Sequence, residues 1–276
     1  MSAEATTPEP FICFTCGTQF TPSTNPPTEC PICTDARQFV GLDGQKWITG
    51  DELRRNFRNL VQPEEPYLYS IHTEPSFGIG ERAFLLQTPA GNVLWDCIAL
   101  LDPETISAVK HLGGVSAIAI SHPHYYTSMV EWSLAFGDAP IYLHAADRQW
   151  VMRPHANIRH WDAESKVLLN ELTLIHTPGH FDGFQVLHWP GGAEGKGVLL
   201  SGDQPQVCMD RRWLSFMTSY PNYIPLGRGA VEGIVASLQP YQFDRIYGAF
   251  PRRTVVQDAK RALERSAARY VAAISD

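Results

Sequence analysis

After about residue 66, the chain consists largely of short apolar runs separated by glycine, proline and polar residues. Many of these runs are rich in small or β-branched residues. Runs of this length and composition are typical of buried strands. The pattern predicts strands over residues 67–72, 83–87, 92–98, 115–120, 139–143, 172–177, 184–189, 196–201 and 243–247.

Other segments mix apolar with polar residues and predict helices. They cover residues 103–112, 127–136, 144–151, 229–238 and 255–273. The first of them is followed by Gly113 and Gly114, as expected at the end of a helix. A further helix over residues 50–60 is expected because Thr49 and Glu52 fit a capping box, in which each residue satisfies a backbone N–H group of the helix start.

Three of the predicted strands run into residues that commonly bind metals. These residues are His122 and His124 after the strand over 115–120, His180 after 172–177, and Asp203 after 196–201. Three histidines with a carboxylate nearby form a zinc-type ligand set that leaves one position for water. Taken alone, His122 and His124 could equally be surface histidines of a turn, but the two later stretches favour a metal site.

The three stretches together resemble the motifs of the metallo-β-lactamase-fold metallohydrolases. The resemblance rests on Ser121-His-Pro-His124, Thr177-Pro-Gly-His180 and Ser201-Gly-Asp203, and it extends from about residue 67 to the C-terminus. It implies an α/β fold of four αββα layers, in which two sheets pack together with helices outside and metals at one edge. It also implies that His122, His124 and His180 form the first metal site, and that Asp203 matches the carboxylate that bridges two metals.

The second metal site of that family has no counterpart here. The family's motif usually continues His-x-His-x-Asp-His, whereas Tyr126 and Thr127 occupy the last two positions in this chain. The family also has a late histidine after its last core strand, but no histidine follows His188. We therefore expect one divalent metal at most, with Zn²⁺ as the expected ion, and an empty site stays open as an alternative.

Two C-x-x-C pairs near the N-terminus predict a second kind of metal site. Cys13 and Cys16 are separated by thirteen residues from Cys30 and Cys33, the pattern of a zinc ribbon or a rubredoxin-like knuckle. Four thiolates close all positions around one ion, which favours a structural role. Zinc is the expected ion, while iron and a pair of disulfides stay open. The predicted division is a tail and knuckle over residues 1–45 and a metallo-β-lactamase-like domain over 46–276.

Composition narrows the classes of function. The 276 residues carry a net charge of −7, and 44% of them are hydrophobic. An acidic chain gives no support for binding nucleic acid or a membrane surface. No stretch approaches the roughly 20 apolar residues of a membrane helix. The first ten residues lack the apolar core of a secretory signal, so we expect a frayed tail on a cytoplasmic protein.

The predicted function is a metal-dependent hydrolase that uses a metal-activated water on a small-molecule substrate. Asp203 is expected to accept the proton of the water, to hold the water in line or to bind the metal. Asp182 is a candidate for a replacement ligand or for the acid that protonates the leaving group. Tyr126, or Tyr125 beside it, is a candidate donor to a developing oxyanion, and both could instead pack beneath the metal loop.

Three other classes of function compete with this prediction. The chain could bind a ligand or partner without turnover. It could be a redox protein, because rubredoxin-like knuckles beside this fold resemble the flavodiiron proteins, although the missing ligands argue against a diiron centre. It could be a nuclease of the same fold, which the acidic composition disfavours. Esters, thioesters, lactones and phosphoesters stay open as substrates, and nothing in the sequence indicates the oligomeric state.

Overall fold

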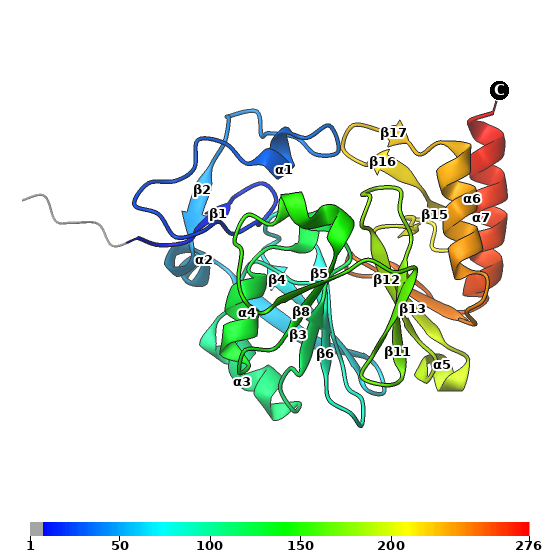
Figure 1. The fold of residues 1–276 in the computed structure, drawn as a ribbon, viewed down its shortest axis with the longest axis horizontal. Helices are drawn as coiled ribbons and strands as arrows, with labels where there is room; N and C mark the ends of the chain where they lie inside the picture. Colours follow the sequence, from blue (N-terminus) through cyan, green and yellow to red (C-terminus); the bar gives the residue numbers. More distant parts are fainter. Residues whose placement is uncertain (1–7, 276) are drawn as a thin grey trace, which may run out of the picture.

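The computed structural model describes residues 8–275 as two β-sheets that face each other, with helices on the outer side of each (Figure 1). Residues 1–7, part of the predicted tail, and residue 276 lie outside the described range. The four layers confirm the predicted αββα sandwich. Helices α3 (Pro103–His111) and α4 (Met129–Ala135) cover one sheet, and α6 (Arg228–Leu238) and α7 (Ala259–Ala273) cover the other.

The first sheet has seven strands in sequence order. It is antiparallel from β3 to β6 and parallel from β6 to β9. Its strands are β3 (Arg58–Glu65), β4 (Leu68–Glu74), β5 (Arg82–Leu86), β6 (Val93–Trp95), β7 (Ala117–Ala119), β8 (Ile141–His144) and β9 (Ile158–Trp161). The parallel part is joined by α3 and by the segment that contains α4.

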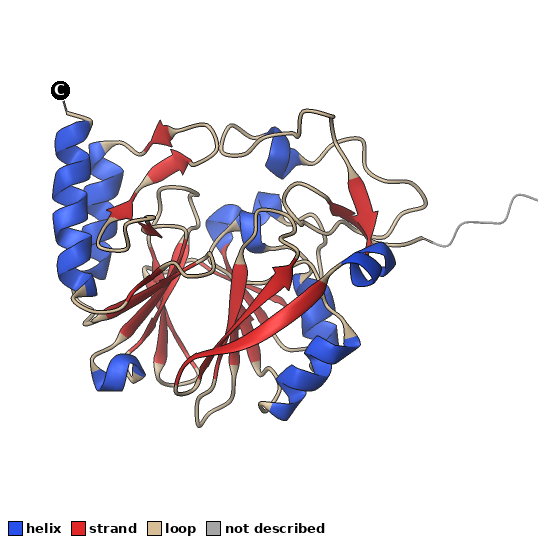
Figure 2. Ribbon diagram, turned by 180° about the vertical axis from the view of Figure 1, so that it is seen from behind, coloured by secondary structure: helices blue, strands red, loops and turns tan. Residues whose placement is uncertain are grey.

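The second sheet has six strands in the order β10-β11-β12-β13-β18-β19, and only the β13–β18 pair is parallel. Its strands are β10 (Ser165–Leu168), β11 (Leu172–His176), β12 (Gln185–Trp189), β13 (Val198–Gly202), β18 (Arg245–Gly248) and β19 (Thr254–Val255). The short elements after residue 189 are α5 (Gly192–Gly195) and the hairpin pairs β14 (Gln206–Val207) with β15 (Leu214–Ser215) and β16 (Met217–Ser219) with β17 (Ile224–Pro225). Figure 2 shows the two sheets from the opposite side.

The space between the sheets is filled by large apolar side chains that both sheets contribute. The first sheet supplies Leu68, Phe84, Leu86, Val93 and Trp95, and the second supplies Leu172, Leu174, Leu187, Leu200 and Tyr247. Full burial of one such side chain contributes about 1.5–3 kcal/mol. Separate apolar clusters join the helices to the outer faces of the sheets. The strand ends that carry the histidines are therefore held by packing on both sides.

The N-terminal segment packs on the edge of this sandwich (Figure 1). Strand β1 (Phe11–Cys13) pairs with β2 (Trp47–Thr49), and the short helix α1 (Pro31–Thr34) carries the last of the four cysteines. Ile12, Ile48 and Leu53 share an apolar cluster with side chains of the main domain. The division after residue 45 stays a prediction, and the β1–β2 pair crosses it.

Several elements differ from the predicted ones because tertiary contacts override local preference. Helix α2 (Gly50–Asn56) has the predicted capping box but stops early, since residues 58–65 form β3 against β4. The helix expected over 144–151 is a 3₁₀-helix, η2 (Ala145–Trp150), a form common in short connectors. Strands β9 and β10 were not predicted, and helix α7 begins at Ala259 rather than at residue 255. Among the described residues, no helix is long and apolar enough to cross a membrane.

Candidate metal centre

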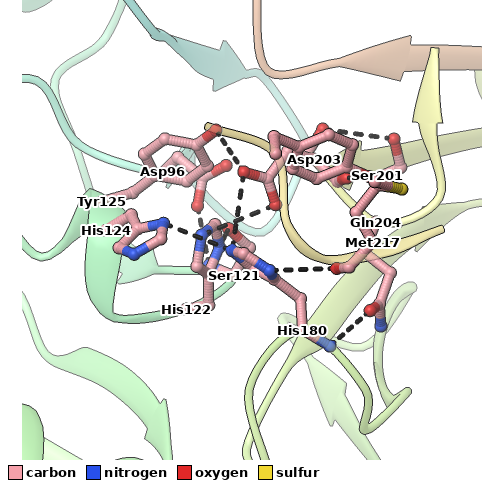
Figure 3. A network of polar contacts seen from close by, with 12 residues as sticks. Asp96, Ser121, His122, His124, Tyr125, His180, Ser201, Asp203, Gln204 and Met217 are labelled. Atoms are coloured by element: carbon pink, nitrogen blue, oxygen red, sulfur yellow. Dashed lines mark hydrogen bonds and ion pairs between the residues drawn. The ribbon is translucent and has the colours of Figure 1, made fainter. Parts of the chain in front are cut away.

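His122, His124, His180 and Asp203 meet at one edge of the sandwich. The two first histidines flank the start of the 3₁₀-helix η1 (Pro123–Tyr125) after β7, His180 follows β11, and Asp203 follows β13. All four are buried, and one potential ligand atom from each lies within 4.8 Å of the others. Figure 3 shows the imidazoles and the carboxylate pointing toward one another. The structure thus brings together the four residues that the sequence placed on separate strand ends.

The orientation of His122 is set by the loop that precedes it. The backbone N–H of Ser121 donates a 2.7 Å hydrogen bond to Asp96 Oδ1, which anchors the loop. The Ser121 hydroxyl lies 2.9 Å from His122 Nδ1, so Nε2 is the nitrogen that faces the centre, 3.5 Å from Asp203 Oδ1. Gly202 can lie this close to Ser121 because it has no side chain. A Cβ atom on residue 202 would lie 2.8 Å from the Ser121 hydroxyl oxygen.

His180 is oriented by the backbone of strand β16. Its Nδ1 donates to the carbonyl oxygen of Thr218 at 2.8 Å and lies 3.2 Å from that of Met217. These contacts fix the proton on Nδ1 and leave Nε2 with a free lone pair, which is the usual way a protein prepares a ligating histidine. Nε2 of His180 lies 3.3 Å from Nδ1 of His124, so both nitrogens face the same point.

Asp203 is held by two tyrosine hydroxyl groups. Tyr125 donates to its Oδ2 at 3.2 Å, and Tyr220 donates to its backbone carbonyl oxygen at 2.7 Å. Oδ1 is buried and has no hydrogen-bond partner within residues 8–275. One oxygen of the carboxylate is therefore anchored, and the other is directed at the histidines.

The electrostatics of the site favour neutral imidazoles. Burial lowers the pKa of His180 to about 4, and burial together with the neighbouring histidines and Arg37 holds the pKa of His122 and His124 well below the usual value. Burial raises the pKa of Asp203 to about 7, against the lowering effect of the Tyr125 hydrogen bond. The contact between His122 and Asp203 is consequently not an ion pair. Neutral imidazole is the form that binds metals.

Buried polar atoms without hydrogen-bond partners show whether a metal fits at the centre. Nε2 of His122 and Oδ1 of Asp203, both directed at the centre, are buried without a hydrogen-bond partner among the described residues. An unpaired buried polar group is costly. A divalent cation bound by imidazole nitrogens and a carboxylate oxygen would satisfy this group, so the residues fit a metal.

Tyr126 and Asp182, which the sequence suggests for catalytic roles, do not lie among the four ligand residues. Tyr126 is buried in the apolar cluster beneath α4, and no contact joins its hydroxyl to the four residues in the described part of the chain. The neighbouring Tyr125 makes the contact with Asp203 instead. Asp182 has an exposed side chain, and its backbone carbonyl accepts a hydrogen bond from His176 at 2.8 Å. The structure therefore assigns neither Tyr126 nor Asp182 a place at the centre.

Several residues at the site are not predicted by the sequence pattern. Asp96 lies in a left-handed conformation, with φ of +59°, and anchors Ser121. Gln38 and Phe39, which follow the last cysteine, line a cavity of about 390 Å³ together with His124, His180 and Asp203. No local pattern marks these residues, because their roles depend on contacts between distant parts of the chain.

The four cysteines form the second group with ligand geometry. Cys13 Sγ lies 3.5 Å from Cys33 Sγ, and Cys16 Sγ lies 3.7 Å from Cys30 Sγ. A tetrahedral zinc site with bonds of about 2.3 Å has sulfur–sulfur edges of roughly 3.8 Å, whereas a disulfide bond is about 2.0 Å long. The cysteines are all free and buried. The spacing favours one ion rather than two disulfides.

Comparison of the fold identifies the class of protein. The structure is similar to VMB-1, with a TM-score of 0.59 and 11% identity, over 78% of this chain and 98% of that one. It is also similar to the DIM-1 metallo-β-lactamase, with a TM-score of 0.58 and 10% identity, over the same shares of the two chains. The protein thus has the metallo-β-lactamase fold, as the sequence motifs predicted. At these identities the likeness concerns the fold and not the activity.

The chain belongs to the same family as the uncharacterized protein YmaE of Bacillus subtilis (strain 168). The two sequences are 48% identical over 267 residues, which cover 96% of this chain and 97% of YmaE. The shared region includes both the cysteine group and the histidine group of this chain. No protein-family model matches the chain.

Proposed function

We propose that the protein is a metal-dependent hydrolase with one divalent ion, Zn²⁺, held by His122, His124, His180 and Asp203. The observation that carries the proposal is the convergence of four buried ligand atoms beside a cavity, of which His122 Nε2 and Asp203 Oδ1 have no hydrogen-bond partner among the described residues. When bound, such an ion lowers the pKa of a bound water and polarises the oxygen of a substrate. A second ion has no ligands of its own, because Tyr126 and Thr127 stand where the family has Asp and His.

The residues of the chain then have distinct tasks. His180 keeps the lone pair of Nε2 directed at the centre because the carbonyl oxygen of Thr218 accepts the proton on Nδ1. Asp203 presents Oδ1 beside His122 Nε2, where it can complete the ligand set or accept the proton of a water. Tyr125 fixes the second oxygen of that carboxylate. Three neutral imidazoles leave the charge of a divalent ion to be balanced by Asp203 or hydroxide.

The proposed substrate is a small molecule with an ester, thioester or lactone bond. The cavity of about 390 Å³ lies within the usual size range of small-molecule sites. The structural role of the cysteine group follows from its closed ligand set, in which four sulfurs leave no position for a substrate. Zinc is the proposed ion there also.

Metal analysis of the intact protein tests this function. We expect two ions per chain, one at each group, and the loss of one ion in His180→Ala. His111→Ala, an exposed histidine at the end of α3, is the matched control and should retain both. Asp203→Asn should lower turnover of a reactive ester by roughly 10²–10⁴-fold if its carboxylate accepts the proton. Full hydrolysis by His180→Ala would contradict the proposal, because turnover would then not depend on an ion at this site.

A further inference from the structure

We propose that the cysteine module, which comprises residues 8–45 with the four cysteines, supplies the substrate-binding wall of the histidine centre. The Gln38 side chain in this module then hydrogen-bonds an N–H group of an uncharged acyl substrate. The inference rests on the proposed function, in that it requires a substrate beside His124, His180 and Asp203. It adds the chemical class of that substrate and a specificity-determining residue from a different part of the fold.

The cavity at the centre is bounded by both parts of the chain. Its lining includes His124, His180 and Asp203, and the cysteine module contributes Thr15, Gln38 and Phe39. Thr15 lies between the first two cysteines, and Gln38 follows the last cysteine by five residues. A molecule that reaches the histidines through this cavity therefore contacts the cysteine module.

The side-chain amide of Gln38 has an oxygen atom without a hydrogen-bond donor among the described residues. Gln38 is only 4% exposed, and its Oε1 is buried without a hydrogen-bond partner among residues 8–275. Leaving an amide oxygen buried and unbonded is unfavourable. A carbonyl oxygen only accepts hydrogen bonds, so the complementary group of a ligand is an N–H or O–H donor. An amide N–H near the cleaved bond meets this requirement.

The segment around Gln38 is fixed before any ligand arrives. The side-chain Nδ2 of Asn222 donates to the carbonyl oxygens of Ala36 at 2.9 Å and Gln38 at 3.0 Å. The hydroxyl of Ser219 donates to the carbonyl oxygen of Arg37 at 2.9 Å. Three consecutive carbonyl groups are thus held by the β16–β17 hairpin. Preorganisation of this kind reduces the entropic cost of binding.

The charge of the wall indicates an uncharged substrate. Within the described residues, the cavity lining contains no lysine or arginine. Arg37 is adjacent in sequence, but its guanidinium lies 4.3 Å from the Phe181 ring centroid and 3.4 Å from Asp35 Oδ1. Its side chain therefore does not line the cavity, although its charge acts on the neighbouring histidines. Phe39, Ile79 and Phe250 give the remaining wall an apolar character suited to an aromatic or aliphatic substituent.

The test uses three hydroxamic acids, whose hydroxamate group binds zinc, as probes. Acetohydroxamic acid reaches only the metal, 3-phenylpropanohydroxamic acid adds a phenyl group, and N-acetylphenylalanine hydroxamic acid adds both the phenyl group and an amide N–H. Their dissociation constants are measured by calorimetry on the full-length, metal-loaded protein. We expect Gln38→Met, which keeps the side-chain length but removes the amide, to weaken only the third probe, by roughly 3- to 10-fold.

Two further variants complete the design. Phe39→Ala should weaken both phenyl probes and leave acetohydroxamic acid unchanged. Leu42→Ala, in the same module but exposed and outside the cavity, is the matched control and should affect none. Equal effects of Gln38→Met on the two phenyl probes, or none, would overturn the inference while leaving the metal centre intact. Failure of all three probes to bind the wild type would contradict the metal centre itself.

Discussion

The hydroxyl of Tyr125 offers a stringent test of the site because the next residue provides its control. Tyr125 and Tyr126 are adjacent, both are buried, and both have a pKa that burial raises well above the usual value. Only Tyr125 reaches the centre, with its hydroxyl 3.2 Å from Asp203 Oδ2. Replacing either residue by Phe removes one oxygen atom and keeps the ring that packs beneath the loop.

The expected magnitude follows from the nature of the bond. A hydrogen bond to a charged acceptor contributes about 1.5–3 kcal/mol, and each 1.4 kcal/mol changes an equilibrium constant about tenfold. Tyr125→Phe should therefore weaken metal binding at the histidine group by roughly 10- to 100-fold, which is also the usual cost of losing a group that orients a ligand. Tyr126→Phe should leave the affinity within about threefold of the wild type.

The assay is a titration with Co²⁺, whose absorption reports its ligands, in competition with a chelator. Thermal unfolding of the metal-free variants shows whether either replacement acts through stability alone. Equal losses of affinity in the two variants would refute the argument, because packing rather than the bond to Asp203 would then be responsible. A larger loss of metal affinity in Tyr126→Phe than in Tyr125→Phe would show that Tyr126, and not Tyr125, supports the metal centre.

Two further predictions concern the cysteine group and the buried carboxyl groups. Replacing Cys16 and Cys33 by Ser should release one ion and unfold the N-terminal module, and unchanged metal content would contradict the assignment. Burial raises the pKa of Glu81 to about 8, so the folded state holds a proton that the unfolded chain releases near pH 4.5. Stability should fall as pH rises from 5 to 8, by up to about 1.4 kcal/mol per unit. Glu81→Gln should reduce this slope in urea unfolding, and an unchanged slope would refute that origin.

The four candidate ligands could be predicted from the sequence because each is marked locally. A ligand-type residue follows a short apolar strand in every case, and strand ends of one sandwich meet at a common edge. His122, His124, His180 and Asp203 are recognised in this way without knowledge of the pairing of strands. The Cys13–Cys33 pattern is equally local, since two tight turns suffice to present four sulfurs.

The supporting residues could not be predicted, because their roles depend on contacts between distant segments. The sequence makes Asp182 a candidate because it lies two residues after His180. The backbone turns between them, with Gly179 N–H bonded to the Phe181 carbonyl at 3.0 Å and Thr177 N–H to that of Phe184 at 2.8 Å. This tight turn leaves the Asp182 side chain exposed. No sequence pattern around Gln38 marks it as a site residue. Its position in the cavity lining follows only from the packing of the cysteine module against the main domain.

The cysteine group and the histidine group are connected by a short series of contacts. Through these contacts, the cysteine module can influence the position of the histidines. Cys33 lies just before the segment whose carbonyl groups are bonded by Ser219 and Asn222. The same hairpin presents the Thr218 carbonyl that orients His180. An ion bound by the cysteines would therefore hold a loop that contacts both the hairpin supporting His180 and the wall of the cavity. Loss of that ion should disturb Gln38 and His180 together, which a module that merely stabilised the N-terminus would not do.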